Sequence, residues 1–194
     1  MTSLIVTNIY IFIMATVLAV LEIQIEGQFG WAKNLPTWRP KGHEWYAKLY
    51  AKIMSGKELT GYHATMFAFV FLVFHLPYVF GLTWTLEHWI STLSLFFIFI
   101  ALWDYLWFVL NPHFPIRYFA KNNPNHKNFF LGVPLDYYFA LGVSILILIP
   151  AFLAGYQNIF TWWIFNVGLF AIQLLAVILF SLYVLKIDNW IKTD

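Results

Sequence analysis

Long runs of apolar residues, separated by shorter polar segments, dominate the chain. Five of these runs are long enough to cross the roughly 30 Å of hydrocarbon in a bilayer, which takes about 20 residues of helix. Backbone N–H and C=O groups find no water in that layer, so a spanning run has to satisfy them internally as a helix. We therefore predict an all-α integral membrane protein, with a bundle of five transmembrane helices in a single membrane domain over residues 1–194. The predicted spans cover residues 4–25, 62–82, 89–110, 135–153 and 159–185.

A shorter periodic segment stands in the loop between the first two spans. Residues 42–55 read GHEWYAKLYAKIMS, in which Trp45, Leu49 and Ile53 recur at i, i+4 and i+8 while the lysines occupy another arc. This pattern is typical of a short amphipathic helix that lies in the membrane interface. On one interpretation the helix only anchors the loop to anionic lipid. On the other it covers a site at the same depth.

The composition agrees with this class and excludes others. Apolar residues make up 61% of the chain and charged residues only 10%, which is too little charge to cover a soluble globule of 194 residues. A soluble enzyme and a nucleic-acid-binding protein are therefore excluded. The absence of cysteine excludes disulfides, thiolate catalysis and iron–sulfur clusters. No basic residue precedes the first apolar run, so we expect it to be retained as a membrane helix rather than to act as a signal peptide.

The basic residues fall on one side of the five predicted spans. The loops 83–88 and 154–158 on the N-terminal side carry no lysine or arginine. Cytoplasmic loops near membrane helices are enriched in these residues, so we expect the N-terminus outside and the C-terminus in the cytoplasm. All 11 basic residues lie on the cytoplasmic side in this arrangement: Lys33, Arg39, Lys41, Lys48, Lys52, Lys57, Arg117, Lys121, Lys127, Lys186 and Lys192.

Carboxylates and imidazoles also gather at the cytoplasmic ends of the predicted spans. Ionisable side chains inside membrane segments are costly and are usually functional. Asp104 lies about 9 Å inside the third span, and Glu22 and Glu26 share one helix face. Carboxylate and imidazole are the ligands that iron, manganese and zinc take in proteins. The candidate ligands of a divalent metal are Glu22, Glu26, His63, Asp104, Asp136, His113 and His126.

Two metal-free chemistries use residues of the same region. His63 with Glu22 or Asp104 forms an acid/base pair, and these three are the candidate catalytic residues. An anionic lipid headgroup is the second possibility, held by arginine. The candidate substrate-binding residues are Arg39, Arg117, Trp38 and Trp107. The alternative without chemistry is that the polar side chains only end or cap their helices, as Asp136 does favourably in a first turn.

Three stretches on this side look like motifs. They are residues 30–40 (GWAKNLPTWRP), 57–63 (KELTGYH) and 103–113 (WDYLWFVLNPH). Pro36 and Pro40 disfavour a continuous helix in the first of them. A loop with this content packs against another part of the molecule or binds something.

These observations favour a membrane-embedded, metal-dependent enzyme with its site at the cytoplasmic face and a lipid or other apolar substrate. With a redox metal the reaction would be oxidation or desaturation, and with zinc it would be hydrolysis or isomerisation. The alternative is a non-catalytic accessory subunit of a larger membrane complex. A transporter or proton-coupled carrier ranks third, because few polar residues lie near the midplane and no repeat is visible. The expected partners are membrane lipids and either a second copy of the chain or a membrane complex.

Overall fold

The computed structural model describes residues 2–54, 56–114, 116, 119, 126 and 128–190, and it is all-α apart from one two-stranded hairpin. Within these residues, five helical segments are long and apolar enough to cross a membrane, which confirms the predicted fold class. The spans are formed by α1 (Thr2–Glu26), α3 (Gly61–Val79), α4 (Leu86–Leu110), α5 (Leu135–Leu146) with α6 (Ile149–Leu153), and α7 (Ile159–Leu179) with the π-helix η2 (Phe180–Leu185). A short 3₁₀ helix, η3 (Ile187–Asn189), follows the last span.

Two details differ from the sequence prediction. The fourth span is broken at Ile147 and Leu148, where α5 ends and α6 begins. Pro150 explains the break, because proline lacks an N–H and its ring disfavours helical geometry just before it. The second difference is the antiparallel pair β1 (Phe129–Phe130) and β2 (Val133–Pro134) in the loop after α4. Leu131 and Gly132 both have positive φ, as a tight two-residue hairpin turn requires.

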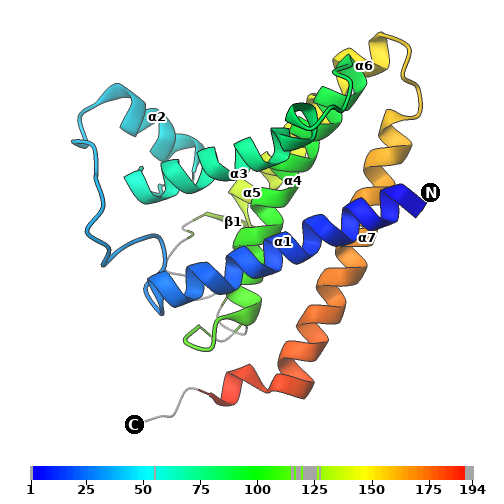
Figure 1. The fold of residues 1–194 in the computed structure, drawn as a ribbon. Helices are drawn as coiled ribbons and strands as arrows, with labels where there is room; N and C mark the ends of the chain where they lie inside the picture. The colour runs from blue at the N-terminus through cyan, green and yellow to red at the C-terminus, as the bar shows by residue number, and fades with distance from the viewer. Residues whose placement is uncertain are drawn as a thin grey trace.

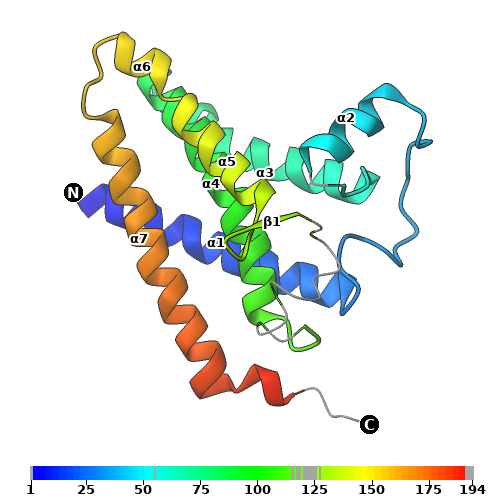
Figure 2. The same cartoon turned by 180° about the vertical axis from the view of Figure 1, so that it is seen from behind.

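Helix α4 is the centre of the molecule. Just over half of its apolar window (56%) is buried, compared with 17% for α3 and 11% for α7. Helix α1 packs on one side of α4 (Figure 1) and α5 packs on the opposite side (Figure 2). The main core cluster joins apolar residues of α1, α3, α4, α5 and α7, with Phe99, Leu106 and Phe108 of α4 almost fully buried. The outer faces of α3 and α7 are left apolar and exposed, as lipid-facing helices are.

Buried polar side chains fasten the spans together. Asn8 on α1 is fully buried and donates to the Asn166 side chain on α7 at 2.9 Å. Gln173 in turn donates to Asn8. Ser94 on α4 donates to the Ser144 carbonyl on α5 at 2.9 Å. Interhelical hydrogen bonds of this kind stabilise helix packing where no hydrophobic difference between helix and lipid exists.

The short helix predicted between the first two spans is present as α2 (Trp45–Ile53). It buries none of its residues, and its apolar stripe of Trp45, Leu49 and Ile53 is exposed. An exposed apolar stripe on a helix that also carries Lys48 and Lys52 is the pattern of an interfacial helix.

Candidate metal centre and adjoining pocket

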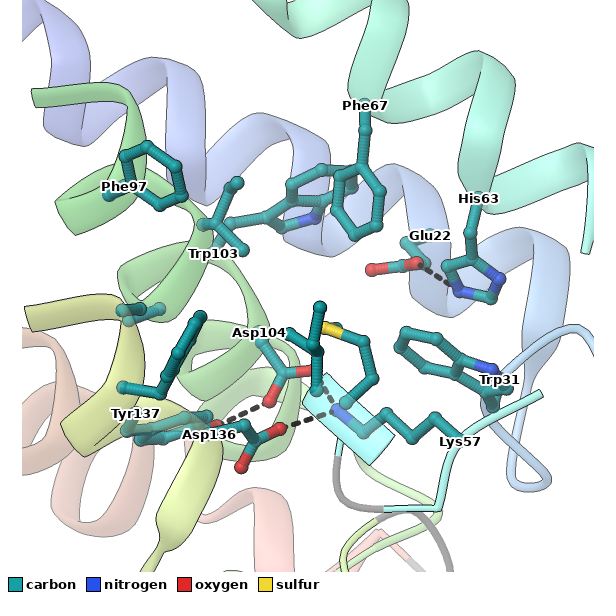
Figure 3. Close-up of a pocket in the computed structure, with 16 residues that line it drawn as sticks. Glu22, Trp31, Lys57, His63, Phe67, Phe97, Trp103, Asp104, Asp136 and Tyr137 are labelled. Carbon is teal, nitrogen blue, oxygen red and sulfur yellow. Dashed lines mark hydrogen bonds and ion pairs between the residues drawn. The ribbon is translucent and has the colours of Figure 1, made fainter. Parts of the chain in front are cut away.

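Four of the polar residues named from the sequence line a pocket of about 130 Å³ between α1, α3, α4 and α5: Glu22, His63, Asp104 and Asp136. Figure 3 shows its polar part, with Glu22 and His63 on one side and Asp104 and Asp136 on the other. Ile53 and Met54, at the end of α2, also line it. The C-terminal end of the helix between the first two spans therefore forms part of the pocket wall.

Three of the candidate ligands form a compact group, here called the triad: Glu22, Glu26 and His63. One ligand atom of each lies within 4.8 Å of the others. The His63 Nε2 atom is 3.6 Å from Glu22 Oε1 and 3.5 Å from Glu26 Oε1, and all three side chains are buried. His63 Nε2 itself has no hydrogen-bond partner among the described residues. A buried imidazole nitrogen and two carboxylates at this spacing form a group that could hold a metal ion.

Local sequence explains how the triad is built. Glu22 and Glu26 are one helical turn apart on the last turns of α1 and so share a face. Thr60 is the N-cap of α3: its hydroxyl accepts from the backbone N–H of His63 and lies 2.8 Å from His63 Nδ1. With Nδ1 protonated and donating to Thr60, the lone pair of Nε2 points at the carboxylates. A hydrogen bond at the second ring nitrogen is how metal-ligating histidines are usually oriented.

The loop after α1 completes the wall behind His63. Trp31 and Ala32 both have positive φ, which is unusual for residues with a side chain. This turn stacks the Trp31 ring on His63, with centroids 3.8 Å apart and planes 13° apart. It also directs the Ala32 N–H to the Glu26 carboxylate. Two motif-like stretches, residues 30–40 and 57–63, therefore meet at the triad.

Gly61 allows the start of α3 to lie against the loop that contains Thr37 and Trp38. A Cβ atom at this position would lie 3.3 Å from both Thr37 Oγ1 and Trp38 Cβ, closer than nearly all Cβ contacts. The Gly61 N–H donates to the Trp38 carbonyl at 2.8 Å, and the Tyr62 N–H donates to Thr37 Oγ1. Glycine is thus the residue that lets the start of α3 approach the loop closely.

Charge is unbalanced at the triad. No lysine or arginine forms an ion pair with Glu22 or Glu26 among the described residues. Two buried glutamates this close repel each other and need either a proton or a cation. With neutral His63, a divalent cation balances the two carboxylates.

A second polar cluster lies across the pocket, here called the Lys57 network. Lys57 Nζ is 3.1 Å from Asp136 Oδ2 and 3.4 Å from Asp104 Oδ1, although the lysine side chain is only 3% exposed. His126 bridges the same two aspartates, with Nε2 at 2.9 Å from Asp104 and Nδ1 at 3.0 Å from Asp136. The Tyr137 hydroxyl donates to Asp104. Lys57 also lies over the Trp31 ring, 4.4 Å from its centroid.

The charges of the Lys57 network cancel. A histidine with a carboxylate at each nitrogen donates from both and so carries a positive charge. Burial opposes that charge, but the attraction and hydrogen bonds of Asp104 and Asp136 outweigh burial and raise the pKa of His126. Two cations then face two carboxylates. The network is complete without a ligand, whereas the triad is not.

The structure therefore divides the seven candidate ligands. Glu22, Glu26 and His63 form the triad, and Asp104, Asp136 and His126 belong to the Lys57 network. His113 is exposed in the loop after α4, where its backbone N–H donates to Asn111.

The candidate substrate-binding residues are spread out. Arg39 is held by the loop itself, pairing with Glu58 at 3.1 Å and donating to the carbonyls of Ala32, Leu35 and Thr37. The Trp38 side chain is largely exposed and lines a separate shallow groove. Trp107 is buried against Phe108 and Phe114. Arg117 lies outside the described residues.

Sequence reasoning missed Lys57, Trp31 and Tyr137 as members of this region. In the sequence Lys57 stands out only as a charge in a loop, and nothing in its spacing marks it as buried. The two motif-like stretches at residues 30–40 and 57–63 contain Trp31 and Lys57, and they are the sequence signal that could have placed both residues in this region. Tyr137 stands beside Asp136 in the first turn of α5, which is weaker information.

Comparison with other proteins adds no assignment. No protein-family model, curated protein or solved structure matches this chain. The chemistry of the triad and of its pocket is therefore the basis for the function.

Proposed function

We propose that the protein is a membrane-embedded enzyme that uses a divalent metal held by Glu22, Glu26 and His63 and acts on a lipid or other apolar substrate. One observation carries this proposal: His63 Nε2, buried and without a hydrogen-bond partner, faces two buried carboxylates that no lysine or arginine among the described residues neutralises.

The donor set limits the metal and its chemistry. Two carboxylates and one imidazole suit iron, manganese or zinc. Three protein ligands leave positions for water or substrate, as in catalytic rather than structural sites. A metal there would supply either an activated water or a redox centre.

The protein's own residues have separable roles in this proposal. Thr60 and Trp31 orient the imidazole, and the Ala32 N–H orients the Glu26 carboxylate. Lys57 lines the same pocket as Glu22 and His63, with its ammonium group held by Asp104 and Asp136. Lys57 therefore forms part of the polar wall beside the metal site, and Asp104 acts through Lys57 as a positioning residue.

We further propose that this site opens at the cytoplasmic leaflet. The support is the confinement of all 11 basic residues to the side of the spans on which Glu26 and His63 lie.

Metal analysis of the purified protein tests the assignment. We expect a stoichiometric amount of iron, manganese or zinc in the wild type, and its loss in Glu22→Gln, Glu26→Gln and His63→Gln. Glu87→Gln and His75→Gln are matched controls, since neither residue belongs to the triad, and they should keep the metal. A wild-type protein without stoichiometric metal, or triad variants that retain it, would overturn the proposal.

A further inference from the structure

The pocket continues beyond its polar groups along an apolar stripe of α4. Phe97, Ile100, Ala101 and Asp104 all line it, and their spacing of i, i+3, i+4 and i+7 places them on one helix face. Seven residues of helix span about 10 Å, so the pocket runs from Asp104 toward the middle of the span. The rest of this apolar part is formed by Phe67 of α3 with Phe139 and Ala140 of α5.

The arrangement of the helices opens this apolar part to lipid. Helices α3 and α5 both contact α4, and the two make no extensive contact with each other in the described structure. Phe139, at the border, is half exposed. Because α3, α4 and α5 are all spans, a slot between them faces acyl chains rather than water. Ala101 and Ala140 keep the slot open, since a larger side chain at either position would occupy it.

The polar end of the slot is neutral once a divalent metal is bound. The Lys57 network balances its own charges, and the metal balances the triad. A substrate with a full charge would leave the polar end with one net charge, and burying an uncompensated charge is costly. The buried indole N–H of Trp103, which lines this end beside Glu22, is a donor that suits a neutral oxygen.

We propose that the slot binds one hydrocarbon chain of a neutral lipid, which enters sideways from the bilayer between α3 and α5. Its uncharged oxygen-bearing end, a hydroxyl or an ester carbonyl, then lies at the polar end beside Glu22, His63 and Lys57. Chain binding depends on the slot alone, whereas any reaction at the oxygen depends on the function proposed above.

Photocrosslinking in nanodiscs tests this binding, with a long-chain fatty alcohol that carries a diazirine in its chain as the probe. We expect labelling to map to the slot residues, among them Phe97 and Phe139. Ala140→Phe fills the slot and should reduce labelling about tenfold, as overpacking of a well-fitted site does. Ala101→Leu should act in the same direction. Ala171→Phe, at an exposed position on α7, is the matched control and should label like the wild type.

Two further measurements test whether the ligand is uncharged and whether chain binding is independent of the metal. A fatty acid probe of equal length, ionised at neutral pH, should label the slot several-fold less than the alcohol. Wild-type protein stripped of metal with a chelator should keep the label, so failure of the metal proposal and failure of the slot proposal give different results. Equal labelling of wild type and Ala140→Phe, or stronger labelling by the ionised acid, would overturn the inference.

Discussion

The two polar clusters of the pocket are built from the same kinds of side chain and differ in one respect. The Lys57 network pairs two aspartates with Lys57 and His126, so each carboxylate has cationic partners at 2.9–3.4 Å. The triad has two glutamates and one histidine, with no lysine or arginine paired to them in the described chain. The first cluster is a finished structural unit, and the second is finished only by a proton or a cation.

The comparison shows that residue type alone does not reveal which buried acids of this protein already have cationic partners. Asp104, flanked by tryptophans inside a span, is the more conspicuous residue in the sequence. Yet it accepts from Lys57, His126 and Tyr137, so its bonding capacity is largely used. Glu22 and Glu26 sit near a helix end, where acids are common, and they face the unpartnered nitrogen.

The largest expected effect on folding stability comes from removing a cation of the Lys57 network. Lys57→Met leaves Asp104 and Asp136 buried with one cation fewer, and removing one partner of a buried ion pair costs about 3–5 kcal/mol. We expect a marked fall in the midpoint of thermal unfolding, followed by tryptophan fluorescence in detergent. Lys52→Met, on the exposed face of α2, is the control and should change the midpoint little. An unchanged midpoint in Lys57→Met would contradict the charge balance argued here.

At the triad, the expected effect on folding stability comes from bound metal rather than from an ion pair. A metal present at about 100 times its Kd stabilises the folded state by about 2.7 kcal/mol, because it binds the folded chain and not the unfolded one. Removing it with a chelator should lower the unfolding midpoint of the wild type and leave that of Glu22→Gln unmoved. If the chelator shifts both proteins equally, the metal acts somewhere other than the triad.

The pH dependence of folding stability tests the charge of His126 in the Lys57 network. The pKa of His126 is raised in the folded protein, so its stabilising charge is fully present below its ordinary pKa of about 6.5. The contribution is lost as the pH rises through the folded-state value. Wild type should therefore exceed His126→Gln in stability at low pH, and the difference should shrink toward alkaline pH. The comparison is made in chelator so that metal release does not contribute. A difference that grows with pH would show that His126 is not the charged partner.

The smallest expected effect concerns orientation of the imidazole. Trp31→Leu removes the ring stacked on His63, an interaction worth about 1 kcal/mol, and should weaken metal affinity about fivefold. Competition with a fluorescent chelator measures the change. Trp45→Leu, at an exposed position of α2, should leave affinity unaltered. Equal affinities in the two variants would assign Trp31 to packing of the loop only.

The sequence by itself determined the membrane class, the five spans and the short helix before α3, because the length and period of an apolar run are local properties. It also determined that Glu22 and Glu26 share a face, since one turn of helix separates them. The sequence pattern does not indicate the hairpin at 129–134. The break in the fourth span is also not predicted, although Pro150 is a local signal for it.

Only the tertiary structure decided which acids share a site. No local feature of the sequence around Lys57 indicates that its side chain pairs with Asp104 and Asp136, or that the glutamates of α1 lie beside His63 instead. That partition depends on where α3 begins relative to the end of α1, which the contact of Gly61 with the Trp38 loop sets. The physical reason is that helix formation is encoded within a few residues, whereas charge compensation is a property of neighbours far apart in the chain.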